Sequence, residues 1–110
     1  MNEGPQGSLW ILGYKTEGAG PLIETRDGAR TEVLGGMVYP IDAPGENAAF
    51  VVDNASASFS WSETGRPEKM FRNQVRETQS GRTHTHTQQD AMAAGVQRGG
   101  RATGLYRAGP

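Results

Sequence analysis

The chain has 110 residues, a net charge of −1, 16 glycines and only 35% hydrophobic residues. This length and this shortage of apolar residues fit one small domain and exclude a large buried core. The near-zero charge gives no long-range attraction to nucleic acid or to an anionic membrane, and no apolar run is long enough to span a bilayer. The absence of cysteine excludes disulfides and zinc-thiolate sites.

The first seven residues are punctuated by Gly4, Pro5 and Gly7. Such breakers predict a flexible lead-in over 1–7. No charged leader with an apolar core follows, so we expect no signal peptide in this chain.

A short pattern then occurs twice. Ile11-Leu12-Gly13 recurs as Val33-Leu34-Gly35, 22 residues later, and a weaker echo pairs Leu22-Ile23 with Phe50-Val51. Strand-like segments that alternate at a spacing of roughly 20 to 30 residues are typical of a β-solenoid, in which each turn stacks on the next. We therefore predict parallel β-helix coils over 8–63.

The expected strands of this region, in chain order, are 8–16, 22–26, 31–39, 49–53 and 55–63. The first is almost continuously apolar, which predicts a strand covered on both faces. The third contains Gly35-Gly36, where a bulge would fit. In the last, Ala57, Phe59 and Trp61 alternate with serines, so we expect one buried face and one wet face.

One turn supports a rival fold. Asp27-Gly28 lies between two strand-like runs and is a common hairpin signal. It would make 22–26 and 31–39 antiparallel neighbours in a β-sandwich. One contact distinguishes the two folds. Val33 would lie beside Ile11 in the solenoid and antiparallel beside Ile23 in the sandwich.

Residues 64–110 are polar and rich in glycine and arginine, which predicts an irregular C-terminal extension. Within it we expect, in order, a strand or short helix at 69–78, a polar edge strand at 82–87 and a weak helix at 88–96. Leu105 and Tyr106 are the expected anchor of the C-terminus. The arginines alternate with acidic residues, which favours a solvated surface over a nucleic-acid site.

The stretches WILGYKTEG, LIETRDGARTEVLGGMVYP, AFVVDNASASFSW, VRETQSG and GLYRAGP resemble the C-terminal region of bacterial proteins in the pectate-lyase-like superfamily. That superfamily consists of right-handed parallel β-helices and includes polysaccharide lyases and glycoside hydrolases. The resemblance implies terminal coils with further coils upstream, a carbohydrate-related role and an extracellular or periplasmic location. No catalytic motif of the superfamily can be placed on this chain, so the catalytic residues are unknown.

Four aromatic residues are candidates for carbohydrate binding, because an aromatic face supplies apolar area next to a polar group. They are Trp10, Tyr14, Tyr39 and Trp61. Each such residue is more often core or coil-stacking material than part of a sugar-binding surface.

Other chemistry has weaker support. Paired carboxylates can hydrolyse a glycosidic bond, and the candidates on or near strands are Glu17, Glu24, Glu32 and Asp53. Lys15 and Arg26 could serve a lyase. His84 and His86 share a strand face at a spacing that can chelate a metal, but surface histidines are the simpler interpretation, and we expect no metal and no cofactor.

The leading hypothesis is a structural one. The chain would form the terminal coils and cap of a larger carbohydrate-associated β-helix protein, without catalysis of its own, and its partners would be upstream coils or a polysaccharide. The alternative is a small β-sheet carbohydrate-binding module. An enzyme complete in itself is a third hypothesis.

Overall fold

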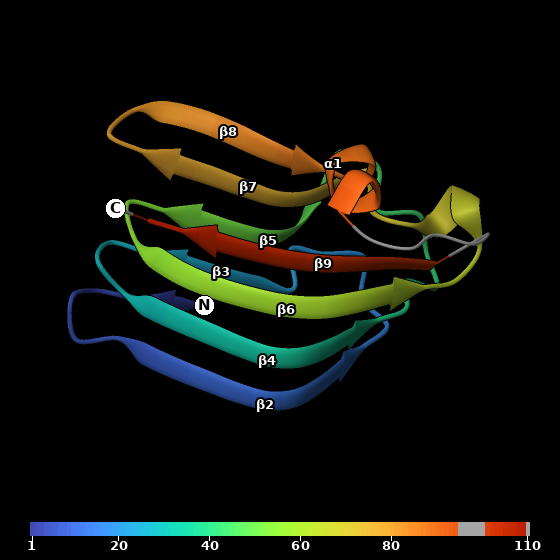
Figure 1. Ribbon diagram of the computed structural model, residues 1–110. Helices are drawn as coiled ribbons and strands as arrows, with labels where there is room; N and C mark the ends of the chain where they lie inside the picture. The colour runs from blue at the N-terminus through green and yellow to red at the C-terminus, as the bar shows by residue number, and fades with distance from the viewer. Residues whose placement is uncertain (95–100, 110) are drawn as a thin grey trace.

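The computed structural model describes residues 1–94 and 101–109. The chain is all-β and forms a parallel β-solenoid of about three turns (Figure 1). Sheet A contains, in spatial order, β1 (Asn2–Glu3), β3 (Ile23–Arg26), β5 (Ala48–Asp53), β7 (Asn73–Gln79) and β8 (Arg82–Thr87). Sheet B contains β2 (Ser8–Thr16), β4 (Arg30–Val38), β6 (Ser56–Thr64) and β9 (Arg101–Ala108).

The 22-residue repeat is confirmed by the strand register. Ile11 lies opposite Val33 in a parallel pair, whereas the sandwich required Val33 to lie antiparallel beside Ile23. The second repeat is also parallel, but its register differs by one residue from the sequence echo, because Phe50 lies opposite Ile23 and not Leu22. The sandwich is therefore not favoured.

The Asp27-Gly28 turn forms a corner between the two sheets and not a hairpin. Both residues have positive φ, 53° and 85°, and their N–H groups donate to the carbonyl oxygens of Asp53 and Asn54 at 3.0 and 2.8 Å. Asn54 repeats the conformation one coil later with φ 47° and donates to the carbonyl of Thr78 at 2.8 Å. Asp, Asn and Gly tolerate this left-handed region, and that is why the pair fits a corner as well as a hairpin.

A bulge bends sheet B at the predicted position. Gly13 in β2 and Gly35 in β4 both have positive φ, 74° and 79°. β6 has no matching extra residue, so the register between β4 and β6 shifts between Leu34 and Gly36. The stacked glycines thus let both strands turn without strain.

The core lies between the two sheets. Phe50 of sheet A stacks on Phe59 of sheet B with ring centroids 4.4 Å apart, and the ring of Trp61 lies 5.2 Å from that of Phe50. Ala57, Phe59 and Trp61 are at most 5% exposed, which confirms the predicted buried face of this strand.

The described part of 64–110 is more regular than expected. After a short 3-10 helix, η1 (Pro67–Lys69), the chain adds β7 to sheet A. β8 then pairs antiparallel with β7, and β9 pairs antiparallel with β6. Figure 1 shows β8 and helix α1 (Gln88–Ala94) beyond the last coil. Polar strands can form here because pairing satisfies the backbone of the last coil while their outer faces stay wet.

Two other expectations concern the ends of the chain. The helix expected at 88–96 is confirmed over Gln88–Ala94, and residues 95–96 lie outside the described residues. The lead-in 1–7 contains β1, which pairs in parallel with β3.

A buried polar network joins β6 to β7 at the C-terminal end. The indole Nε1 of Trp61 donates to Gln74 Oε1 at 2.9 Å, and Gln74 Nε2 donates to Glu63 Oε1 at 2.8 Å. The N–H of Phe71 donates to Glu63 Oε2 at 2.9 Å. Burial raises the pKa of Glu63, and the two hydrogen bonds oppose that shift.

Tyr106 anchors β9 against sheet A. Its hydroxyl donates to Glu77 Oε1 at 3.0 Å, and the N–H of Gly109 donates to Glu77 Oε2 at 2.6 Å. Burial and the contact with Glu77 raise the pKa of Tyr106 to about 12. Leu105 is 78% exposed, so the predicted anchor is correct for Tyr106 and wrong for Leu105.

Candidate functional site

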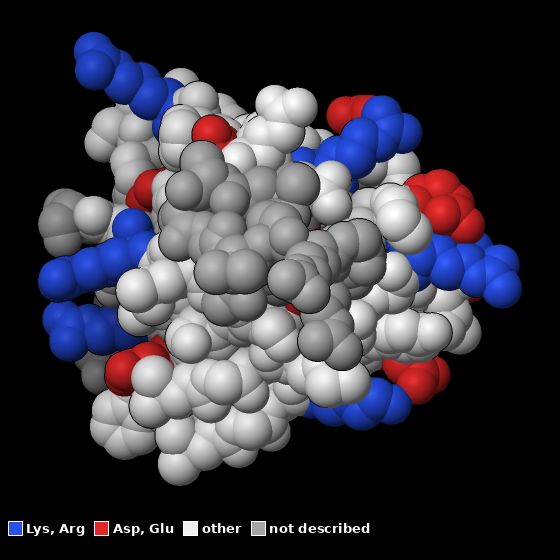
Figure 2. All heavy atoms as spheres, turned by 45° about the vertical axis from the view of Figure 1, so that its right-hand side comes forward, with Lys and Arg blue, Asp and Glu red and all other residues white. Residues whose placement is uncertain are grey.

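Charges of both signs are interspersed on the surface. On the face in Figure 2, basic side chains lie beside acidic ones and form no continuous basic area. On this face the distribution agrees with the net charge of −1.

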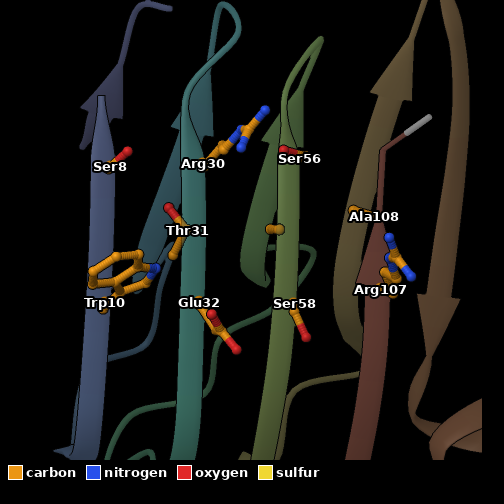
Figure 3. A pocket seen from close by; sticks show the side chains of 10 residues that line it. Ser8, Trp10, Arg30, Thr31, Glu32, Ser56, Ser58, Arg107 and Ala108 are labelled. Carbon is orange, nitrogen blue, oxygen red and sulfur yellow. The ribbon is translucent and has the colours of Figure 1, made fainter. Parts of the chain in front are cut away.

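The outer face of sheet B carries a row of functional side chains across four strands. Trp10 of β2 lies opposite Glu32 of β4, Glu32 lies opposite Ser58 of β6, and Ser58 lies opposite Arg107 of β9. Figure 3 shows these four side chains at neighbouring positions. Because adjacent strands are about 4.8 Å apart, the row spans about 14 Å along the solenoid axis.

A groove of about 500 Å³ follows this row. Small side chains make its floor, since β6 contributes only Ser56, Ala57 and Ser58 to the lining. Larger side chains from the flanking strands make its walls: Trp10, Arg30, Glu32 and Arg107. The alternation of serine with large apolar residues in β6 therefore produces the hollow, because the bulk of this strand points inward.

An apolar row lies beside the groove. Leu12, Leu34 and Leu105 occupy the next outward position on β2, β4 and β9, and are 75%, 48% and 78% exposed. Trp10 is 76% exposed. The expectation that 8–16 is covered on both faces is therefore wrong for the outer face. Exposed apolar side chains gathered on one face are typical of interaction surfaces.

The charged side chains of the groove are available to a ligand. Arg30, Glu32 and Arg107 take part in no ion pair with any residue that the structure describes. Two cations and one anion give the groove a net positive charge. Such a groove favours an anionic ligand with polar groups.

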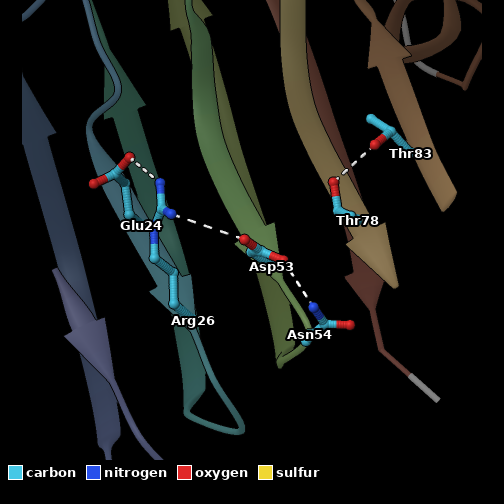
Figure 4. Close-up of polar contacts among 6 residues, drawn as sticks. All are labelled: Glu24, Arg26, Asp53, Asn54, Thr78 and Thr83. Atoms are coloured by element: carbon cyan, nitrogen blue, oxygen red, sulfur yellow. Dashed lines mark hydrogen bonds and ion pairs between the residues drawn. The ribbon is translucent and has the colours of Figure 1, made fainter. Parts of the chain in front are cut away.

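The outer face of sheet A differs in this respect (Figure 4). Arg26 Nη2 lies 3.0 Å from Glu24 Oε1, and Arg26 Nη1 lies 3.8 Å from Asp53 Oδ2. The hydrogen bond and charge of Glu24 raise the pKa of Arg26. These three charges are thus paired with one another, unlike the charges of the groove.

The structure brings two of the four candidate carboxylates, Glu24 and Asp53, together around Arg26 and places the other two elsewhere. Glu24 and Asp53 lie on the outer face of sheet A, and Glu17 pairs with Lys15 at 2.7 Å. Glu32 is the only carboxylate among the residues that line the groove. The groove therefore lacks the pair of carboxylates that glycoside hydrolysis commonly uses.

The four aromatic candidates occupy different environments. Trp10 lines the groove, whereas Tyr14 is half-buried against the core. Trp61 is 2% exposed and lies in the core, where a surface ligand does not reach it. Tyr39 is 39% exposed and lies in a separate hollow of about 190 Å³ with Pro40, Ile41, Arg66 and Lys69.

The two histidines lie on the side of β8 that faces Tyr106, where His84 is exposed and His86 is half-buried. His84 stacks on Tyr106 with ring centroids 6.5 Å apart, and the ring of His86 lies 5.0 Å from that of Tyr106 and 6.5 Å from that of Trp61. Burial lowers the pKa of His86. Within 1–94 and 101–109, no three potential ligands converge on a metal position.

Sequence reasoning missed Arg30, Ser58 and Arg107 as site residues. One signal could have found part of the row. The 22-residue repeat that sets Ile11 beside Val33 also sets Trp10 beside Glu32. Arg107 had no such signal, because β9 joins sheet B from outside the repeat.

Comparisons with protein-family models, with curated proteins and with solved structures give no match. Among the described residues there is also no helix with the length and hydrophobicity needed to cross a membrane. The functional argument therefore depends on the geometry of sheet B.

Proposed function

We propose that the outer face of sheet B binds a polysaccharide, and that the chain is the capped end of a carbohydrate-associated solenoid. The observation that carries this proposal is the row Trp10, Glu32, Ser58 and Arg107 along an open groove. An indole face packs on the C–H face of a sugar ring, while the carboxylate, hydroxyl and guanidinium bind its hydroxyl groups.

The spacing of the row supports an extended ligand. Neighbouring strands are about 4.8 Å apart, which is close to the length of one sugar unit in an extended chain. A polymer lying along the solenoid axis would meet one strand with each unit. Arg30 and Arg107 favour a polymer with carboxylate groups, because a guanidinium binds a carboxylate through two parallel hydrogen bonds.

Binding of polygalacturonate and of its methyl ester to the full chain tests this proposal. The two polymers share a backbone and differ in charge. We expect the acid form to bind more tightly, with an affinity that falls as salt is added. We expect Trp10→Ala to weaken both polymers about tenfold or more, and Arg107→Gln to weaken mainly the acid form.

Tyr39→Ala is the matched control. It removes an exposed aromatic ring in a different hollow, so binding should stay unchanged. Equal loss in Trp10→Ala and Tyr39→Ala, or no saturable binding by the full chain, would contradict a site on sheet B.

The asymmetry of the two ends favours a second, structural function. β8, β9 and α1 close the C-terminal end, as a terminal repeat with a polar outer side does in solenoids. In a longer protein, further coils would stack on β2, and the resemblance implies a right-handed winding and an extracellular or periplasmic location for them.

A chain with one added coil tests the structural role. A copy of residues 30–55 inserted before Ser8 would add one parallel turn. We expect a higher denaturation midpoint and a single cooperative transition, because nearest-neighbour stacking is the main source of stability in solenoids. A separate, earlier transition of the added coil would contradict stacking at this end.

A further inference from the structure

The N-terminal end of the solenoid leaves a long apolar strand edge uncovered. β2 pairs with β4 on one side and with no strand of the described chain on the other. Over its nine residues, SLWILGYKT, it has a single charge, Lys15, and no proline. Natural edge strands are usually short, charged or interrupted by proline, so an edge of this kind is suited to pairing with another strand.

The unpaired backbone groups of this edge can be assigned. The carbonyl of Gly7 accepts from the N–H of Arg30 at 2.8 Å, and the carbonyl of Thr16 accepts from the N–H of Tyr39 at 2.9 Å. Since the backbone groups of successive residues in a strand point to alternate sides, Ser8, Trp10 and Leu12 present theirs at the open edge.

The interior is also incompletely covered at this end. Ile11 and Tyr14 pack against the core but stay partly exposed. At the next level along the solenoid, Val33 is fully buried. Val33 is covered on both sides, by β2 and by β6. A further layer on β2 would cover Ile11 in the same way.

The C-terminal end of a second copy is not suited to form that layer. β8 has the sequence RTHTHT, and its antiparallel pairing, with α1 beside it, ends the parallel stack. Head-to-tail stacking of copies would therefore place an apolar edge on a polar cap.

We propose that the open end of the 110-residue chain binds the open end of a second copy, with the two β2 strands antiparallel across a two-fold axis. A two-fold axis perpendicular to the sheets makes each sheet continue into its equivalent. The dimer is closed, because both outer ends are then the polar caps.

The end face is large enough for a stable dimer. The molecule extends 39 × 27 × 23 Å, and strands of nine residues, about 30 Å long, run along the longest extent. These extents bound the end face at 39 Å by 23 or 27 Å, which leaves room for the roughly 800 Å² per partner of a standard interface.

This contact is independent of polysaccharide binding, because it leaves the outer face of sheet B open. It uses the edge of β2 on which upstream coils would stack in a longer protein, so it is proposed for the 110-residue chain and excludes such coils. It would nevertheless extend that face. Trp10 lies on the edge strand, so the two grooves would meet at the axis and present one surface of twice the length.

The mass of the full chain in solution, measured over a range of concentrations by sedimentation, tests the proposal. We expect twice the mass of one chain at high concentration. Ile11→Lys places a charge in the contact, and Leu12→Lys places one on the edge itself; both should give a monomer. Leu105→Lys is the matched control, since Leu105 is as exposed as Leu12 but lies on the far edge of sheet B, and it should remain dimeric.

Circular dichroism establishes folding, and Leu12→Lys provides the test if Ile11→Lys does not fold. A monomer at every concentration would overturn the proposal. So would growth into larger oligomers, a dimer that survives Leu12→Lys, or loss of the dimer in Leu105→Lys, because each places the contact elsewhere.

Discussion

The two ends of the solenoid differ in how the last layer meets water. At the N-terminal end, β2 is apolar, parallel to its neighbour and uncovered. At the C-terminal end, antiparallel β8 and β9 cover the last coil; Glu77 binds Tyr106 of β9, and Glu63 joins β6 to Phe71, just before β7. Each repeated coil contributes a similar apolar interior. The segments outside the repeat therefore determine whether an end of the solenoid is covered or exposed to water.

The largest expected effect on this difference comes from the buried network. Glu63→Ala leaves two buried donors without an acceptor: the N–H of Phe71 and one of the two N–H groups of the Gln74 amide, whose other N–H still donates to the Phe71 carbonyl at 2.7 Å. Each buried donor without a partner costs about 1–3 kcal/mol, so we expect a loss of about 2–6 kcal/mol in chemical denaturation. A loss below that range would show that the closed end does not depend on this carboxylate.

The next effect comes from the packing of β9 on Trp61. Gly104 lies opposite Trp61, and a Cβ at Gly104 would collide with the indole ring. We expect Gly104→Ala to destabilise the chain by about 1–3 kcal/mol, measured as a thermal shift. Gly35→Ala is unsuitable as a control because Gly35 has positive φ; Ser58→Ala, on the open outer face of β6, should have little effect.

A smaller loss follows from Tyr106→Phe, which removes the hydroxyl that donates to Glu77. Hydrogen bonds to charged groups contribute about 1.5–3 kcal/mol when buried, and this one is only partly buried, so we expect about 1 kcal/mol. Hydrogen exchange should quicken in β9 before it quickens in β4. Uniform quickening would mean that the cap and the coils open together.

The closed end should also respond to pH, in two opposite directions. Folding lowers the pKa of His86 from its ordinary value of 6.5, so below that pH the unfolded chain binds more protons than the folded chain. The contribution of His86 to stability is therefore full above pH 6.5 and falls as the pH drops below it. Glu63 has a raised pKa, so its contribution is full below 4.5 and falls as pH rises above that value. The free energy of unfolding of each variant, measured by chemical denaturation across this pH range, tests both effects. His86→Phe should remove the loss of stability toward low pH, and Glu63→Gln should remove the loss as the pH rises.

The smallest effect is expected next to Tyr106. Leu105→Ser changes a side chain that is 78% exposed, so the free energy of unfolding should stay within about 0.5 kcal/mol. Tyr106 and Leu105 are neighbours in β9, and they would then contribute differently to stability because Tyr106 faces the core and Leu105 faces water. A large loss in Leu105→Ser would mean that the apolar row of sheet B is covered in solution.

Sequence reasoning found the parallel coils because Ile11 and Val33 repeat one inward position. It misplaced the second repeat by one residue, since the loops between the sheets differ in length and no single period describes both. The edge strand at 82–87 and the helix after it were predicted, but β9 was not predicted as a strand, because it pairs with β6 from outside the repeat. Among the site candidates, the alternation in β6 already placed Trp61 on the expected buried face, whereas the nearly continuous apolar run of β2 does not indicate whether Trp10 faces outward.

The serine face of β6 has a consequence for how such a surface can diversify. Inward and outward positions alternate along this strand, so a substitution at Ser56 or Ser58 alters the depth of the hollow without touching Phe59 or Trp61. Recognition and folding are thus encoded at separate, interleaved positions. New ligand preferences could accumulate on this strand by single substitutions while the interior is inherited unchanged.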